Sequence, residues 1–370
     1  MKIAVPAESA QGETRVSLVP ETVQRLTRDG HTVAVAAGAG DASSYSDDAY
    51  RQAGAEVVAD AGALLGGADV VTKVGEPTSD ELGHLGSGAV VIGMLNARQN
   101  DQLIDDLAGR GITAFSMEMV PRIARAQRLD VLSSQASLAG YKAVLMASNT
   151  IGRFFPLMMT AAGTIPPATV VILGAGVAGL QAIATAKRLG AKVQAFDVRS
   201  VVREQVESLG AEFIDIEVAD AEDSGGYARE LTEQEQEQQT AALGEYVAKA
   251  DVVITTAQIP GRPAPVLVKR GTVEAMREGS VIVDLAAETG GNVEGTVAGE
   301  NVEVGGVTIV GPVNVPASMP EEASVLYSRN LQGLLELIVG EEGLALDFED
   351  EVVAGTVVTH DGKRAGQLAS

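Results

Sequence analysis

Cysteine is absent from this 370-residue chain, and histidine occurs only three times, as His31, His84 and His360. Without cysteine, the chain can form no disulfide, present no thiolate nucleophile and hold no thiolate-ligated zinc ion. Three scattered histidines leave little for a metal site or for an acid–base centre built on imidazole. We therefore predict that the protein binds no metal ion.

Basic and aromatic residues are also scarce. The chain has 27 Lys and Arg residues against 50 Asp and Glu residues, a formal net charge of −23, and only 3% of its residues are aromatic. A field of this sign repels phosphate backbones and few rings are available for base stacking, so we exclude nucleic acid as a partner. Only 8 of the 27 basic residues are lysine. An acidic, lysine-poor surface is typical of proteins that work at high salt, although drift in a GC-rich genome would give the same bias.

Long apolar runs are missing as well. No stretch approaches the roughly 18 consecutive apolar residues of a membrane span, and Met1–Pro6 does not begin a signal peptide. Hydrophobic residues make up 46% and charged residues 21% of the chain, the balance of a soluble globular protein. The length predicts two domains.

What the chain does have is an alternation of short β-branched runs with helical stretches. Over the first 115 residues we predict helices at Pro20–Arg28, with proline at its start, and between Asn96 and Gly109, with Asn96 or Asn100 as its cap. Such alternation predicts a parallel sheet covered by helices on both faces. The predicted strands are Lys2–Val5, Thr32–Ala36, Val70–Val74, Ala89–Gly93 and Ile112–Phe115.

A second unit begins after the double proline Pro166–Pro167. Here we predict a helix at Val177–Leu189 and strands at Thr169–Leu173, Lys192–Phe196, Glu212–Ile216, Asp251–Thr255, Ser280–Asp284 and Val307–Val310. The acidic stretch Glu217–Gln239 predicts a mobile excursion followed by a solvated helix, with or without a role.

Two further helices connect these units. Leu132–Met146 bridges them, and the amphipathic Glu322–Val339 returns to the first domain, which makes that domain discontinuous. The predicted fold class is α/β, with two doubly wound parallel-sheet domains and a deep cleft between them. The predicted boundaries are residues 1–131 with 320–370 for the first domain and 132–319 for the second.

The second unit also carries a nucleotide signature. Gly174, Gly176 and Gly179 fit G-x-G-x-x-G between a predicted strand and a predicted helix, and the next strand ends in Asp197. The glycines permit a tight turn, backbone approach to a pyrophosphate and close helix–strand packing, as in Rossmann-like domains. The helix N-terminus offers N–H groups to the phosphates, and Asp197 can accept hydrogen bonds from the ribose diol. The negative charge of Asp197 would repel a 2′-phosphate, which favours NAD(H) over NADP(H). The positive charge of Arg199, two residues later, slightly weakens this preference.

A longer motif indicates which family of dinucleotide-binding proteins the chain resembles. The run Arg122–Gln135, followed by Ala139-Gly140-Tyr141, closely resembles the NAD(H)-binding component of proton-translocating transhydrogenase. The resemblance covers nearly the whole chain and includes Lys187–Ala191, Gly225–Ala228, Ile259–Pro265 and Val283–Ala286. Alanine dehydrogenase shares the same two-domain fold and the segments Glu13–Val16 and Lys73–Pro77, so it is the alternative.

Chemistry separates these two families. Alanine oxidation needs an acid–base group, whereas hydride exchange between nicotinamide rings needs only positioning and exclusion of water. By the same resemblance, Asn96 and Glu288 stand in this chain where alanine dehydrogenases carry a histidine and an aspartate. The resemblance therefore favours transhydrogenation, and Arg15 and Lys73 become inherited architecture that steadies the first domain.

The resemblance also implies the site residues. Arg122, Gln127, Asp130 and Ser133 would position the nicotinamide without acid or base chemistry, although a helix cap and a solvated face would account for the same residues. Tyr227 would close over the adenosine as part of a mobile loop. The implied cofactor-binding residues are Arg125, Gly174, Gly176, Val177, Gly179, Asp197, Val198, Arg199, Gly226, Tyr227, Thr256, Ala257 and Gln258.

The implied activity is that of an oxidoreductase subunit that binds NAD(H) and presents NADH to NADP⁺ on a partner, coupled to proton translocation. Because the chain stops at Ser370, we expect the membrane-spanning and NADP(H)-binding parts to be separate subunits. The protein would be a homodimer in the cytoplasm, peripherally associated with the cytoplasmic membrane. Besides alanine dehydrogenase, a non-catalytic NAD(H)-sensing module would need only the fold and the glycine loop.

Overall fold

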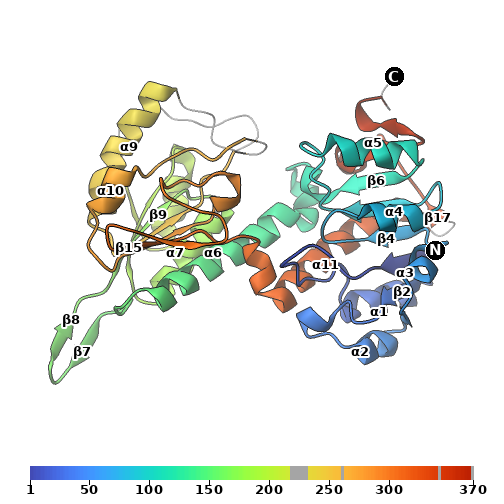
Figure 1. Cartoon of the computed structure of the whole chain (residues 1–370), viewed down its shortest axis with the longest axis horizontal. Helices are drawn as coiled ribbons and strands as arrows, with labels where there is room; N and C mark the ends of the chain where they lie inside the picture. The colour runs from blue at the N-terminus through green and yellow to red at the C-terminus, as the bar shows by residue number, and fades with distance from the viewer. Residues whose placement is uncertain (217–231, 260–261, 341–342, 368–370) are drawn as a thin grey trace. The chain divides into compact units, whose positions relative to one another are not determined.

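The computed structural model describes residues 1–216, 232–259, 262–340 and 343–367 (Figure 1). The chain forms two compact units, of which unit 1 comprises Met1–Gln135 with Pro316–Ser370 and unit 2 comprises Ala136–Val315. These divisions lie four residues from the predicted ones, after residue 135 rather than 131 and before residue 316 rather than 320. Most of the predicted acidic excursion, residues 217–231, lies outside the described residues.

Unit 1 is built on an eight-stranded sheet with the order β19-β18-β6-β5-β4-β1-β2-β3. Its first six strands in the chain are parallel, and β18 and β19 extend the sheet antiparallel at the β6 edge. The strands are β1 (Lys2–Val5), β2 (Thr32–Ala36), β3 (Glu56–Val58), β4 (Val70–Thr72), β5 (Val90–Gly93), β6 (Thr113–Ser116), β18 (Val357–His360) and β19 (Lys363–Arg364).

Helices cover both faces of this sheet. Alternate strand residues point to opposite faces, so the strands present apolar side chains on both faces and each face needs a covering layer. Ile3 and Val5 pack in one core with α1 and α11, while Ala4 packs in the other core with α3 and α5. The fold is therefore α/β and Rossmann-like in this unit. The helices are α1 (Pro20–Arg28), α2 (Asp47–Gln52), α3 (Ala61–Leu65), α4 (Ser79–His84), α5 (Asp101–Gly109), α11 (Pro320–Ile338) and α12 (Glu351–Thr356), with a short hairpin of β16 (Val339–Gly340) and β17 (Gly343–Leu344) after α11.

Hydrogen bonds show which residue caps α5 and how α11 is attached to unit 1. Asn100, not Asn96, caps α5, since its side chain accepts a hydrogen bond from Leu103 N at 3.2 Å. Helix α11 joins unit 1 through hydroxyls on its buried face: Ser324 and Ser328 accept hydrogen bonds from the backbone N–H groups of Val16 and Val19. Helix α11 thus belongs to unit 1, where the segment Glu322–Val339 is expected to lie.

Unit 2 holds a seven-stranded sheet with the order β11-β10-β9-β12-β13-β15-β14, parallel except for β14. Its strands are β9 (Thr169–Leu173), β10 (Lys192–Phe196), β11 (Glu212–Phe213), β12 (Val252–Thr255), β13 (Val281–Asp284), β14 (Asn301–Val304) and β15 (Val307–Val310). Two cores again lie on the two faces of the sheet. The helices are α6 (Val131–Thr150), which begins in unit 1, α7 (Val177–Arg188), α8 (Arg203–Ser208), α9 (Glu233–Ala248) and α10 (Arg270–Glu274).

The described part of the predicted acidic stretch begins α9, where Gln234, Glu237 and Gln238 are exposed, in agreement with a solvated helix. Beyond this stretch α9 turns inward, and Leu243 and Val247 are fully buried in a core of unit 2. An unpredicted hairpin of β7 (Met158–Thr160) and β8 (Gly163–Ile165) projects from the rest of unit 2 (Figure 1). Among the described residues, no helix is long and apolar enough to cross a membrane.

Candidate nucleotide-binding site

The glycine signature forms the turn between β9 and α7. Gly174 has a φ of +101°, and a Cβ built on it would lie 2.5 Å from Thr256 Oγ1. A Cβ on Gly179 would lie 1.8 Å from the carbonyl oxygen of Gly174. Both positions therefore require glycine, one for the left-handed backbone and one for the close packing of helix on strand.

The middle glycine has a different environment. At Gly176 the nearest atom to a built Cβ is Arg199 Nη2 at 4.0 Å, so the backbone is open to an approaching group. Gly176 is also the N-cap residue of α7, and no side chain of the described residues caps this helix. Free N–H groups and the positive end of the helix dipole face this opening, which suits the pyrophosphate of a dinucleotide.

Asp197 follows β10 and lies against the glycine loop. Its Oδ2 accepts hydrogen bonds from Ala175 N at 2.7 Å and Arg199 Nη2 at 2.9 Å. Its Oδ1 accepts hydrogen bonds from Arg199 N and Arg199 Nε, each at 2.9 Å. The structure therefore brings the loop, the carboxylate and the guanidinium together as the sequence predicts, and it adds a bidentate Asp197–Arg199 ion pair that the sequence did not reveal.

Those of the other predicted residues of unit 2 that the structure describes lie at the same edge of the sheet. Thr256 donates from Oγ1 to the Gly174 carbonyl oxygen at 3.1 Å, and Ala257 N donates to Asn292 Oδ1 at 3.0 Å. Gln258 is exposed and donates to the Leu285 carbonyl oxygen at 3.0 Å. Val177 is exposed at the start of α7, and Val198 is partly buried after β10. The predicted Gly226 and Tyr227 lie outside the described residues.

The candidate nicotinamide residues belong to unit 1, in and around the short helix η3 (Ala124–Leu129). Asp130 caps α6: its Oδ1 accepts from Ser133 N at 2.9 Å and its Oδ2 accepts from Ser133 Oγ at 2.7 Å. Arg122 and Gln127 are exposed. The structure thus brings Asp130 and Ser133 into contact, in the geometry that a helix cap alone would also give.

Arg125, predicted to bind the cofactor, has a partner in its own unit. Its Nη1 and Nη2 pair with the two carboxylate oxygens of Asp350 at 2.7 and 2.8 Å. Asp350 is the N-cap of α12 and also accepts hydrogen bonds from Val352 N and Val353 N. The Arg125 guanidinium and these N–H groups hold the pKa of Asp350 at about 2, well below its usual range. Arg125 therefore joins η3 to α12.

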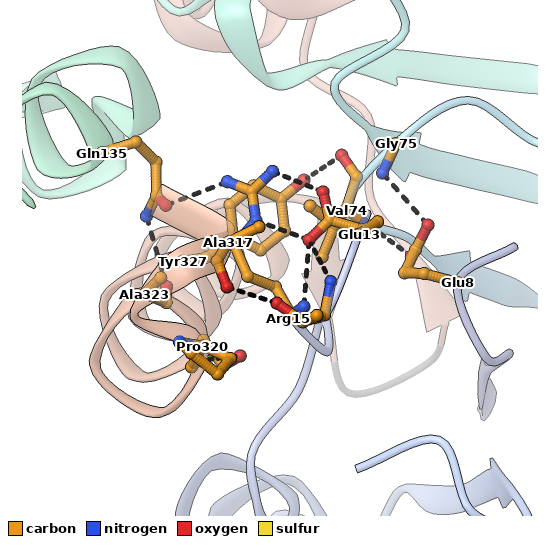
Figure 2. A network of polar contacts seen from close by, with 12 residues as sticks. Glu8, Glu13, Arg15, Val74, Gly75, Gln135, Ala317, Pro320, Ala323 and Tyr327 are labelled. Atoms are coloured by element: carbon orange, nitrogen blue, oxygen red, sulfur yellow. Dashed lines mark hydrogen bonds and ion pairs between the residues drawn. The ribbon is translucent and has the colours of Figure 1, made fainter. Parts of the chain in front are cut away.

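Unit 1 contains a buried polar network around Arg15 whose contacts the sequence does not predict (Figure 2). Arg15 is 5% exposed; its Nη2 lies 2.6 Å from Glu13 Oε2, and its Nη1 donates to Gln135 Oε1 at 3.0 Å. Gln135 in turn donates to the Ala323 carbonyl oxygen of α11 at 3.2 Å. Arg15 thereby links the start of the chain, α6 and α11, in agreement with a role in steadying the first domain.

Lys73 lies at the centre of a neighbouring charge cluster and is fully buried. Its Nζ lies 2.7 Å from Glu81 Oε1 and 3.7 Å from Glu8 Oε2. Glu8 also accepts a hydrogen bond from Val74 N at 2.6 Å, and Tyr327 OH donates to the Lys73 carbonyl oxygen at 2.8 Å. Burial raises the pKa of Glu8 in spite of Lys73 and these backbone donors. No local pattern indicates this cluster, because Glu8 and Tyr327 are far from Lys73 along the chain.

Comparisons with known proteins agree over the whole chain. Residues 4–139 match the model of the alanine dehydrogenase/PNT N-terminal domain, and residues 143–366 match that of the alanine dehydrogenase/PNT C-terminal domain. The chain is similar to an NAD(P) transhydrogenase alpha-subunit protein of Rhodospirillum rubrum, with 48% identity over 372 residues that cover 98% of this chain and 97% of that protein.

Two solved structures resemble this one to different degrees. A transhydrogenase from Sinorhizobium meliloti gives a TM-score of 0.90 at 49% identity, covering 98% of this chain and all of that one. An L-alanine dehydrogenase gives a TM-score of 0.82 at 30% identity, covering 100% of this chain and 99% of that one. Alanine dehydrogenase is therefore the more distant of these relatives.

Proposed function

The chain belongs to the alanine dehydrogenase/PNT family, and from this premise we propose that it is the NAD(H)-binding subunit of a proton-translocating NAD(P) transhydrogenase. In this role it presents NADH for direct hydride transfer to NADP⁺ bound by a partner subunit. The observation that carries the proposal is the contrast in identity, 49% to a transhydrogenase structure against 30% to an alanine dehydrogenase structure at nearly equal coverage.

NAD(H) binding is assigned first to unit 2. The open backbone at Gly176 and the uncapped start of α7 bind the pyrophosphate, and Asp197 accepts a hydrogen bond from the adenosine ribose. Val177, Val198 and the Thr256–Gln258 segment border the adenosine. The bound nicotinamide supplies the hydride, so the protein needs to supply orientation and exclusion of water rather than an acid or a base.

At the nicotinamide end we assign Arg122, Gln127, Asp130 and Ser133. The exposed amide of Gln127 can pair with the nicotinamide carboxamide, and the Asp130–Ser133 pair offers a fixed carboxylate and hydroxyl. For Arg125, the bidentate bond to Asp350 supports a role in holding η3 in place rather than a direct cofactor contact.

The family supports one set of proposed partners, and the exposed β7–β8 hairpin supports another. We propose membrane-spanning and NADP(H)-binding subunits as partners, with this chain held peripherally on the cytoplasmic face of the membrane. We further propose a homodimer that uses the β7–β8 hairpin and the residues before it. Phe154, Leu157 and Met159 are 50%, 51% and 76% exposed, and a dimer contact would remove these apolar side chains from water.

The deciding experiment separates three functions with one preparation. The purified protein is mixed with an NADP(H)-binding transhydrogenase subunit, and hydride exchange between NADPH and an NAD⁺ analogue is followed by absorbance. We expect exchange with the partner, none without it, and no NADH formation from L-alanine and NAD⁺. Alanine-dependent NADH formation without exchange would show an alanine dehydrogenase, and tight NADH binding with neither reaction would show a sensing module.

A single variant tests the assigned pocket. Asp197→Ala removes the ribose acceptor and the partner of Ala175 N, so we expect weaker NADH binding and loss of exchange at limiting NADH. Saturating NADH should restore the exchange rate, because Asp197 lies at the ribose and not at the reacting ring.

A further inference from the structure

Asn292 is a fully buried residue whose polar atoms are all used within unit 2. Its Oδ1 accepts from Ala257 N at 3.0 Å, and its Nδ2 donates to the carbonyl oxygens of Ala257 and Pro265, each at 2.8 Å. Its own carbonyl oxygen accepts from Leu267 N and Val268 N. One amide side chain therefore joins the segment after β12 to the segment before α10.

We propose that Asn292 is a positioning residue of the NAD(H) site, a role that rests on the function proposed above. The side chain holds both backbone groups of Ala257, in the way that a neighbouring strand would beyond the end of β12. Thr256 precedes Ala257 and donates to the Leu173 carbonyl oxygen through N and to the Gly174 carbonyl oxygen through Oγ1. The position of the glycine loop thus depends on Asn292 through Ala257 and Thr256.

Asp284 fixes Asn292 from the other side. This fully buried carboxylate at the end of β13 accepts from Asn292 N at 2.8 Å and from Thr296 Oγ1 at 2.7 Å, among other donors. A Cβ on Gly291 would lie 2.8 Å from Asp284 Oδ2, so glycine is required for the approach of the loop. These contacts hold the loop after β13 in place where it presents Asn292.

Only an amide meets the demands of this position. One oxygen must accept a bond and two N–H groups must donate to carbonyl oxygens, and Asn supplies them within a side chain short enough to stay buried. An aspartate would keep the acceptor for Ala257 N but would turn its other oxygen toward the carbonyl oxygens of Ala257 and Pro265. That contact is repulsive when the carboxylate is charged, and it becomes a hydrogen bond when the group is protonated.

The test compares Asn292→Ala and Asn292→Asp with the wild-type full chain. NADH affinity is measured by fluorescence from pH 6 to 8.5, and folding is checked by thermal unfolding at each pH. We expect both variants to bind NADH about tenfold more weakly at pH 8.5, since the loss of well-formed buried hydrogen bonds misplaces the loop. Only Asn292→Asp should regain affinity as the pH falls, because burial raises the pKa of the new carboxyl and the neutral acid donates to one carbonyl.

Asp251→Asn is the matched control. Asp251 is also buried in unit 2 and accepts from Arg153 and from Thr169 N, but it lies before β12, at the opposite end of the strand from Ala257. We expect it to lower the unfolding temperature and leave NADH affinity unchanged.

Three results would count against the proposal or the function beneath it. Asn292 variants that bind NADH like the wild type at every pH would overturn it, and so would a control that weakens binding as much as they do. If Asn292→Ala does not fold, the pH profile of Asn292→Asp decides alone. A wild-type protein that binds no NADH would instead overturn the proposed function, and this inference with it.

Discussion

At the scale of single residues, the Asp197 carboxylate has two competing roles: it binds neighbouring groups of the protein, and in the proposed site it also binds the ribose of the cofactor. Its carboxylate accepts four hydrogen bonds from Ala175 and Arg199, so a ribose diol must share or displace some of them. The Arg199 guanidinium also neutralises the charge that would repel a 2′-phosphate. In the proposed site, the choice between NAD(H) and NADP(H) should therefore depend on Arg199 as well as on Asp197.

Removing Arg199 should sharpen this choice. In Arg199→Ala no guanidinium shields the Asp197 carboxylate, so NADPH binding should fall about fivefold more than NADH binding, the effect of about 1 kcal/mol of added repulsion. Both dissociation constants are measured by fluorescence at low ionic strength. Arg199→Lys keeps the charge without the bidentate geometry and should fall between wild type and Arg199→Ala; an unchanged ratio in all three proteins would contradict the prediction.

The sequence predicts some site residues well and others not at all, for a physical reason. The three glycines and Asp197 lie in one continuous strand–turn–helix–strand unit whose spacing is fixed by local geometry. Asn292 acts on Ala257 and Pro265, which are 35 and 27 residues away. Such a contact depends on the pairing of strands across the sheet, which no local pattern contains. Gly290-Gly291-Asn292 after a strand that ends in Asp284 was the visible hint.

At the scale of elements, the predictions succeed where a regular pattern extends over several residues. The bounds of β1, β2, β9, β10, β15 and α1 are as predicted, because β-branched runs and a leading proline mark them. Strands β3, β7 and β8 have three residues each and none of them is buried, so no apolar run marks them as one marks the equally short but buried β4. Strands β14 and β18 pair antiparallel, outside the β–α alternation that guided the prediction.

The cap of α12 should give stability a defined pH dependence. Because the pKa of Asp350 is about 2 in the folded protein and about 3.9 in an unfolded chain, its charged form stabilises the fold above about pH 4, and this contribution is lost as the pH falls toward 2. Asp350→Ala should cost about 1 kcal/mol of unfolding free energy at pH 7, and Asp350→Asn less, since asparagine still caps.

Denaturant unfolding at several pH values measures this effect. The difference between wild type and Asp350→Asn should be constant from pH 7 to about pH 5 and shrink below about pH 4. A difference that stays constant down to pH 3 would show that the Arg125–Asp350 pair does not stabilise the fold.

The projecting hairpin β7–β8 gives a second prediction at this scale. Met159→Glu places a charge on its most exposed apolar side chain, so the proposed dimer should dissociate while NADH binding is retained. Light scattering after size exclusion gives the molar mass directly. Leu209→Glu, an exposed apolar position after α8, is the matched control and should remain dimeric. A Met159→Glu protein of unchanged mass would place self-association elsewhere.

At the scale of the whole molecule, the alternation of strands and helices accounts for the α/β fold class. The proposed function does not account for the strongly negative net charge. Both sheets are covered on both faces, as near-continuous apolar strands require. The net charge of −23 serves no step of the proposed reaction. Its consequence is self-repulsion, which the many Arg–carboxylate pairs on the described surface offset only locally.

Salt should therefore stabilise this protein. The screening length falls from about 10 Å at 0.1 M to about 3 Å at 1 M, which removes repulsion between separated carboxylates and leaves contact ion pairs less affected. We expect the unfolding temperature to rise by several degrees between 0.05 and 1 M NaCl, with most of the rise below about 0.5 M if screening is the cause. Sodium perchlorate at the same ionic strengths separates screening from salting-out, since only screening gives the two salts the same initial rise. An unfolding temperature that stays constant or falls to 1 M NaCl would exclude adaptation to high salt as the reason for the acidic composition.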